Sequence, residues 1–250
     1  MITALVAFAA LAQGQNRAKP ADLVSRMMDH YSQANTLSGK FTYVQTAAGY
    51  SAKGETRVQF ERPNKIYVMQ QMDGHDDDMK PTKLMARIVS NGSRFLYSVP
   101  KKFDMPYQEL RESVQQNRQV LDLGEIYNIG GSGLIIKPAP LDIAIGRLAD
   151  LKTFRSQIVS LEDQGDETIN GTQAHLVGGD WREYDSAPPS AKYQMAITDA
   201  GDLLRYTMSE KVADPSGKMA PIEVVTTWTM DVKVNGPVDE ALFKDKDLGG

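Results

Sequence analysis

Three histidines are the first candidates for chemistry in this chain of 250 residues, namely His30, His75 and His175. A histidine acts as a general base or a metal ligand when suitable partners lie beside it. We expect His30 to pack beside an apolar helix face and His175 to begin a strand after a turn. Gly131-Ser132-Gly133 has the flanks of a loop and lacks the strand and helix of a nucleophile elbow. No catalytic residue is predicted, although a Ser-His-Asp hydrolase site assembled in space stays an alternative.

His75 also begins the one acidic cluster that suggests a cation site, because Asp76, Asp77 and Asp78 follow it directly. Calcium takes six or more oxygen ligands, which acidic residues supply at alternate positions. A continuous acidic run lacks that spacing, so we expect a solvated loop over residues 73–78 and no metal. The absence of cysteine excludes thiolate nucleophiles, thiolate ligands and disulfides. The sequence has no phosphate-binding loop and no dinucleotide fingerprint, and we expect no cofactor.

Apolar and aromatic side chains are the richer set. Residues of one parity in successive strands lie on the same face of a sheet, and the twelve methionines suit a surface that adapts to apolar guests. This face is either an ordinary core beneath helices or a groove that stays partly open, and composition does not decide between them. The ligand-binding candidates on strands are Phe41, Tyr43, Val58, Phe60, Ile66, Val68, Phe95, Tyr97, Trp228 and Met230.

Two hairpins place most of these candidates. In residues 58–68 and 88–97, apolar and polar residues alternate on both sides of a turn. Pro63-Asn64 favours the first reversal, and Asn91-Gly92 favours a tight type I′ turn with two positive φ angles. Val58, Phe60, Ile66 and Val68 should therefore share one face of an antiparallel sheet.

Helical and strand spacings predict the remaining elements. A helix opens at residues 19–22 and buries Leu23, Met27 and Tyr31 at i, i+4 and i+8. The other predicted segments are a strand over 37–45, a helix over 105–121, a flexible connector over 128–133, a helix over 141–151 interrupted at Gly146, and a strand over 153–161.

The second half is predicted to be a β-meander. Turns at Asn170-Gly171 and at 199–202 separate short alternating strands, including one with Leu204, Tyr206 and Met208. The last strand, over 222–234, holds period 2 with its apolar residues at even positions, and Leu242 and Phe243 should anchor the tail. Two helical insertions separate the strand-rich halves without a linker. We therefore expect a mainly β (α+β) fold in one domain over residues 13–250.

The first residues predict export. Residues 2–12 are apolar and end in Ala10-Leu11-Ala12, the small-x-small pattern of a signal-peptidase site, so residues 1–12 are interpreted as a signal peptide. The segment is too short to cross a bilayer, which takes roughly 20 residues. We expect a periplasmic or otherwise exported protein. A net charge of −4 with no basic run excludes nucleic acid as a partner.

The hairpins and turns carry a family resemblance. Together they are similar to the periplasmic lipoprotein-carrier superfamily, the LolA/LolB-like proteins and their outer-membrane lipoprotein-sorting relatives. The matching residues are Tyr31, Leu37 and Phe41; Phe60-Glu61-Arg62-Pro63-Asn64-Lys65; Val89-Ser90-Asn91-Gly92 with Tyr97 and Pro100; Ile169-Asn170-Gly171 with Ala174-His175-Leu176; Asp199, Gly201 and Leu203; and Asn235, Pro237, Asp239, Leu242 and Phe243.

The resemblance implies an incomplete, strongly curved antiparallel β-barrel, a half-barrel whose concave apolar face is covered by helices. It implies a carrier or chaperone for lipoprotein acyl chains or lipids, not an enzyme, with an envelope membrane protein as a further candidate partner. Arg62 matches the family's Arg-Pro hairpin, where capping of the turn is the simpler role. The segment 141–151 corresponds to the cavity mouth, which makes Leu141, Ile143, Ile145 and Leu148 candidates for the cover and adds Leu141 and Ile145 to the ligand-binding set.

Two other functions remain open. The first is an envelope-stress sensor or a protein-docking scaffold with the same fold, and the second is a hydrolase.

Overall fold

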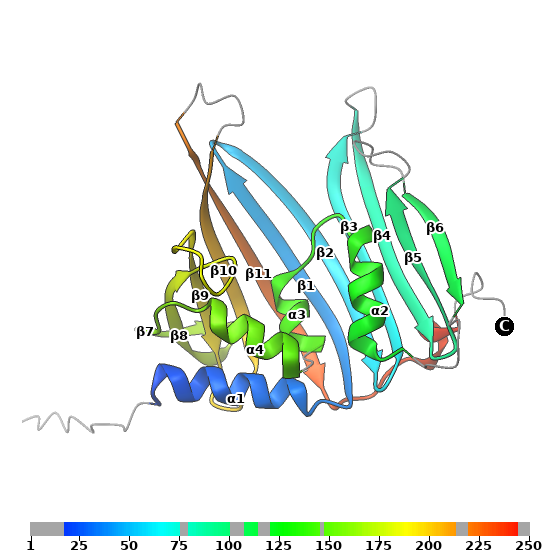
Figure 1. Ribbon diagram of the computed structural model, residues 1–250, viewed down its shortest axis with the longest axis horizontal. Coiled ribbons are helices and arrows are strands. Elements are labelled where there is room, and N and C mark those ends of the chain that lie inside the picture. The colour runs from blue at the N-terminus through cyan, green and yellow to red at the C-terminus, as the bar shows by residue number, and fades with distance from the viewer. Residues whose placement is uncertain are drawn as a thin grey trace, which may run out of the picture.

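Eleven strands form one antiparallel sheet in the computed structural model, which describes residues 18–75, 80–100, 108–114, 121–145, 148–213 and 220–244. Consecutive strands are neighbours except β6 and β7, which form the two edges, and β1 pairs with β11, giving the order β6-β5-β4-β3-β2-β1-β11-β10-β9-β8-β7. The sheet is open between β6 and β7 and curves around its helices (Figure 1). The strands are β1 Thr36–Ala47, β2 Tyr50–Glu61, β3 Lys65–His75, β4 Pro81–Asn91, β5 Arg94–Pro100, β6 Gln108–Val114, β7 Glu162–Ile169, β8 Thr172–Trp181, β9 Ala191–Ile197, β10 Leu203–Val212 and β11 Ile222–Val234. The prediction of a mainly β, curved half-barrel is confirmed.

Short helices lie on one face of this sheet. Figure 1 shows α2, α3 and α4 in front of the strands, while α1 runs along one end and the far halves of β1, β2, β10 and β11 extend beyond the helices. The helices are α1 Pro20–Ser32, α2 Leu123–Gly130, α3 Ala139–Ile145 and α4 Leu148–Gln157, with 3₁₀ turns η1 Gly131–Gly133 and η2 Glu240–Phe243. Among the described residues, no helix combines the length and the hydropathy needed to cross a bilayer.

The elements that the sequence predicts from a clear periodic pattern are confirmed. Helix α1 begins with Pro20 in its first turn and buries Leu23, Met27 and Tyr31, because these side chains share one face. In β11, even-numbered Trp228 and Met230 are buried. Their odd-numbered neighbours include the exposed Asp231. Phe243 anchors the tail, with 1% of its surface exposed.

Both predicted hairpins form. The first joins β2 to β3 and pairs Val58 with Val68 and Phe60 with Ile66, so the four side chains share a face as expected. The second joins β4 to β5, but its turn is not type I′. Only Gly92 has a positive φ, of 93°, and the loop spans the four residues between Ser90 and Phe95. The Asn91 side chain accepts hydrogen bonds from the backbone of the next residues of the loop, which makes the longer reversal stable.

Two predicted segments have a different secondary structure because sheet pairing outweighs local spacing. The helix predicted over 105–121 is wrong, since residues 108–114 form β6 along β5; the rest of that segment up to residue 120 lies outside the described residues. The loop predicted over 73–78 is wrong in its first part, since Asp73, Gly74 and His75 belong to β3. An Asp73–Lys83 ion pair supports this extension. Residues 76–78 lie outside the described part.

The helical insertion also differs in its details. The expected connector over 128–133 is helical, because the Asp122–Glu125 capping box starts α2 and η1 continues it. The helix over 141–151 is divided into α3 and α4 around residues 146–147, which are not described. The strand predicted over 153–161 is wrong. Leu151, Phe154 and Ile158 recur at helical spacing and are buried, so α4 continues to residue 157.

Candidate functional site

The predicted ligand-binding residues meet in one place. All twelve belong to, or pack against, a single cluster of buried side chains on the face that the helices cover. Eleven are buried, and Tyr97 is half-buried with its ring stacked 5.9 Å from that of Phe95. The role of these residues as a surface for a ligand stays a prediction.

Helix α3 covers much of this face. Leu141 and Ile145 from α3 are 0% and 2% exposed, and Phe60 beneath the helices is 0% exposed. Ile143 of α3 is buried too, whereas the side chain of Leu148 lies outside the described residues. The helices therefore cover this face of the sheet.

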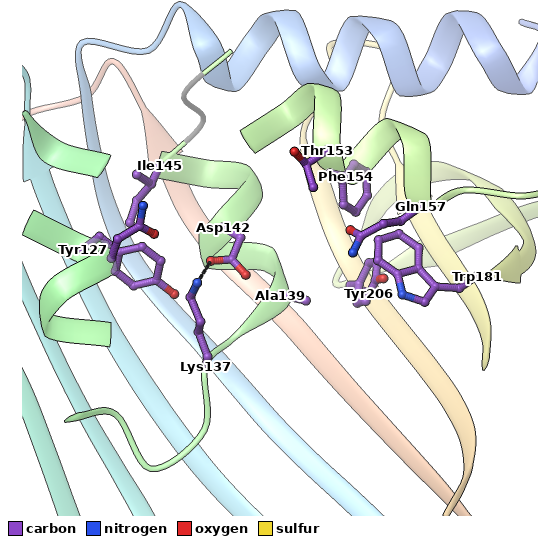
Figure 2. A pocket seen from close by; sticks show the side chains of 11 residues that line it. Tyr127, Lys137, Ala139, Asp142, Ile145, Thr153, Phe154, Gln157, Trp181 and Tyr206 are labelled. Atoms are coloured by element: carbon purple, nitrogen blue, oxygen red, sulfur yellow. Dashed lines mark ion pairs between the residues drawn. The ribbon is translucent and has the colours of Figure 1, made fainter. Parts of the chain in front are cut away.

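A cavity of about 200 Å³ lies between the helices and the sheet. Figure 2 shows its walls: Tyr127 comes from α2, Lys137, Ala139, Asp142 and Ile145 from α3 and the segment before it, Phe154 and Gln157 from α4, Trp181 from β8 and Tyr206 from β10. Of the residues predicted from the sequence, Ile145 lines this cavity. Tyr206 could have been found, because the alternation in its strand places it on the inner face.

The cavity is mixed in polarity but balanced in charge. Lys137 Nζ lies 3.2 Å from Asp142 Oδ1 and 5.2 Å from the centre of the Tyr127 ring. An ammonium is attracted both to a neighbouring carboxylate and to the face of an aromatic ring. The pair leaves no net charge for a guest, so the remaining polarity comes from neutral groups such as the Tyr206 hydroxyl.

Aromatic contacts connect this cavity with the predicted ligand surface. The Trp228 ring lies 5.8 Å from the Tyr206 ring and 6.2 Å from the Tyr43 ring, measured between centroids. These three residues occupy adjacent strands β10, β11 and β1. The cavity therefore borders the apolar face that the sequence predicts.

Arg62 joins three parts of the fold. Its Nε donates to the Ala34 carbonyl at 2.7 Å, and its Nη2 donates to the Ile145 carbonyl, at the end of α3, at 2.5 Å. The guanidinium also lies 5.4 Å from the centre of the Phe60 ring. Burial lowers the pKa of Arg62, but an arginine remains charged in proteins. Arg62 thus does more than cap its turn, because it ties the covering helix to the hairpin.

His175 is not arranged as a catalytic base. Its Nδ1 lies 2.8 Å from Asp166 Oδ1 and its Nε2 lies 3.1 Å from Asp199 Oδ1. Both ring nitrogens therefore face carboxylates and not the hydroxyl of a nucleophile, unlike the histidine of a Ser-His-Asp triad. His30 is a half-buried residue of α1, as expected, and its Nε2 lies 3.1 Å from Asp202 Oδ1. Within the described part of the chain, no group of three or more acidic or histidine residues could hold a metal ion.

Comparison with known proteins gives matches among solved structures. No protein-family model and no curated protein matches the chain. Lipoprotein LppX of Mycobacterium tuberculosis is 14% identical, with a TM-score of 0.40, and the alignment covers 89% of this chain and 99% of that one. LprF of Mycobacterium bovis is 10% identical, with a TM-score of 0.43 and coverage of 88% and 94%.

A third match is a LolA superfamily protein of Nitrosomonas europaea. It is 11% identical, with a TM-score of 0.31 and coverage of 93% and 100%. All of these TM-scores lie below 0.5, so the ligand has to be inferred from this chain's own residues.

Five tyrosines should titrate late. Burial raises the pKa of Tyr43 to about 12, and burial also raises the pKa values of Tyr31, Tyr127, Tyr193 and Tyr206 well above their ordinary value. The native state therefore holds these protons more tightly than the unfolded chain, whose tyrosines titrate near pH 10. This contribution to stability is complete below about pH 10 and is lost as the pH rises towards the native pKa values.

In an alkaline titration we expect the phenolate absorbance of these five residues to appear together with the loss of near-ultraviolet circular dichroism. Protein unfolded in urea serves as the control, because all of its tyrosines should titrate near pH 10. Titration of all the tyrosines near that pH, with the fold intact, would contradict the burial described here.

Proposed function

We propose that the protein is an exported, non-catalytic carrier that shelters acyl chains of lipids or lipoproteins in the cell envelope. The observation that carries this proposal is the covered apolar face, on which twelve predicted residues converge beside a cavity of about 200 Å³. Burying each methylene of an acyl chain contributes about 0.8 kcal/mol, so a dry and adaptable cavity is enough to bind one. Further proposals are that residues 1–12 are removed on export, that residues 13–250 form one domain, and that an envelope membrane protein delivers or receives the guest.

The size of the cavity bears on how a guest enters. An engineered cavity of about 150 Å³ takes up a molecule as small as benzene, so about 200 Å³ holds only part of an acyl chain. Full uptake then requires α3 or α4 to move away from the sheet. Short helices joined by few residues suit such a movement, since the strands beneath them are held by backbone pairing on both sides.

Filling the cavity should block binding. Ala139 is half-buried and lines the cavity, so Ala139→Trp places an indole where the guest would lie. Displacing about two methylenes costs about 1.6 kcal/mol, so the affinity for a fluorescent acyl-chain probe should fall at least about tenfold. The measurement is probe titration with delipidated protein.

Ala21→Trp is the matched control, because Ala21 is exposed on α1 and away from the cavity. We expect this variant to bind like the wild type. Unchanged affinity in a folded Ala139→Trp protein would show that the cavity is not the binding site. If the wild type binds no acyl chain and gains no thermal stability from one, the carrier proposal fails and the sensor or docking scaffold becomes the better reading.

A further inference from the structure

Tyr206 lines the cavity, and its hydroxyl is a buried polar group without a partner among the described residues. Tyr206 is 0% exposed, and its hydroxyl has no hydrogen-bond partner among the described residues. A buried hydroxyl without a partner is costly, so native structures rarely keep one unless something else satisfies it. Because Tyr206 lines a cavity that is large enough for part of an acyl chain, a bound guest could supply the missing partner.

The opposite wall carries a second phenol. Tyr127 of α2 is 2% exposed, and its hydroxyl points toward the Lys137–Asp142 pair (Figure 2), where it interacts with the Asp142 carboxylate. The cavity thus has a phenol on either side, with an ion pair between them that is already neutralised. The neutral group left to donate a hydrogen bond to a guest is the Tyr206 hydroxyl.

This donor set selects the chemistry of the guest. A carboxylate or phosphate would bring a negative charge close to Asp142 and would have to compete with it for Lys137. A neutral carbonyl oxygen needs only a neutral donor and introduces no uncompensated charge. In an acyl-chain lipid, such a carbonyl belongs to the ester that joins the chain to its alcohol.

Resting on the carrier function above, we propose that Tyr206 donates a hydrogen bond to the ester carbonyl of a bound acyl ester and so favours esters over ethers of equal chain length. The chain of such a guest would continue from Tyr206 along the aromatic contacts to Trp228, 5.8 Å away between ring centroids. The apolar face would provide affinity, and the phenol would fix the depth at which the polar linkage lies.

The test compares monopalmitoylglycerol with the hexadecyl ether of glycerol, which has a methylene group in place of the ester carbonyl and a chain of equal length. Each is titrated against the delipidated protein by displacement of a fluorescent acyl-chain probe. The wild type should prefer the ester about fivefold to tenfold, the range for one net hydrogen bond. Tyr206→Phe should remove this preference while binding the ether as the wild type does.

Tyr193→Phe is the matched control, on the neighbouring strand β9. Its hydroxyl donates to the Ser160 carbonyl at 2.7 Å, so it is already paired and should leave the ester preference unchanged. The two variants should also differ in the absence of ligand. Tyr206→Phe removes an unsatisfied group and should raise the melting temperature by about 2–4 °C, whereas Tyr193→Phe breaks a hydrogen bond and should lower it.

The outcomes separate the two proposals. If both lipids bind and Tyr206→Phe keeps the ester preference, or if the wild type has none, the role of Tyr206 is overturned and the carrier function stands. Equal binding of ester and ether would be the result if water alone satisfied the hydroxyl. If no variant binds either lipid, the carrier function and the inference that rests on it both fail.

Discussion

Replacing Arg62 by Met should lower the free energy of unfolding by about 2–3 kcal/mol and speed the exchange of any bound acyl chain. Met keeps much of the aliphatic stem but donates no hydrogen bond, so the carbonyls of Ala34 and Ile145 lose their partner. Hydrogen bonds to a charged group contribute about 1.5–3 kcal/mol each, and partial exposure of Arg62 reduces the sum. Urea unfolding gives the first quantity, and stopped-flow probe displacement gives the second.

The exchange rate should rise because Arg62 holds the last residue of α3. Ile145 both accepts this hydrogen bond and lines the cavity, so losing the bond frees the end of the helix that borders the guest. A cation at a helix C-terminus also favours the helix through its dipole, which Met cannot do.

Two control variants test whether the effect of Arg62→Met comes from its lost hydrogen bonds. Arg62→Lys keeps the charge and can reach one carbonyl, so it should recover part of the lost stability. Arg57→Met removes an exposed arginine paired with Glu55 on the same strand and should change stability little, because exposed ion pairs contribute little. If Arg62→Met is as stable as the wild type and exchanges probe at the same rate, Arg62 does not hold α3.

The parts of the fold that the sequence predicts well are those encoded by a local period. Val58 and Val68, or Trp228 and Met230, show their shared face by parity alone, since side chains alternate along every strand. Parity also places Tyr206 on the inner face. It does not say that Lys137 and Phe154 line the same cavity as Tyr206, because that depends on where α3 and α4 pack, which no periodic pattern in their few residues determines.

Arg62 illustrates the same limit. Its place in an Arg-Pro hairpin is visible in the sequence, whereas its acceptors lie 28 and 83 residues away along the chain. The segment 108–114 is a further case, because its helical spacing loses to pairing with the exposed edge of β5. Tertiary contacts of this kind override local preference.

Glycines near residue 130 provide the second test with a large expected effect. A Cβ atom added to Gly133 would lie 1.4 Å from the Ser98 carbonyl oxygen, a backbone atom of the buried strand β5. Gly133→Ala would therefore have to push η1 and the end of α2 away from the sheet. We expect it to lower the free energy of unfolding by about 3 kcal/mol, the upper end for overpacking of a well-packed core.

Gly131→Ala is the matched control two residues away, and its effect should have the opposite sign. A Cβ there would meet its nearest neighbour at 3.7 Å, and Gly131 already has helical angles, with φ −63° and ψ −23°. Alanine fits without strain and restricts the unfolded chain, so stability should rise by about 0.4–1 kcal/mol. Urea unfolding of both variants measures the two changes in the free energy of unfolding.

This pair also tests why the segment 128–133 is not the flexible connector that its glycines suggest. Flexibility would make Gly131→Ala and Gly133→Ala nearly equivalent, because neither position would have a fixed neighbour. Close approach of the backbone predicts that only Gly133→Ala is damaging, since α2 and η1 reach β5 only where no side chain intervenes. Equal and small effects of the two substitutions would mean that α2 does not rest on the sheet as described, and the cavity wall that carries Tyr127 would then lose its support.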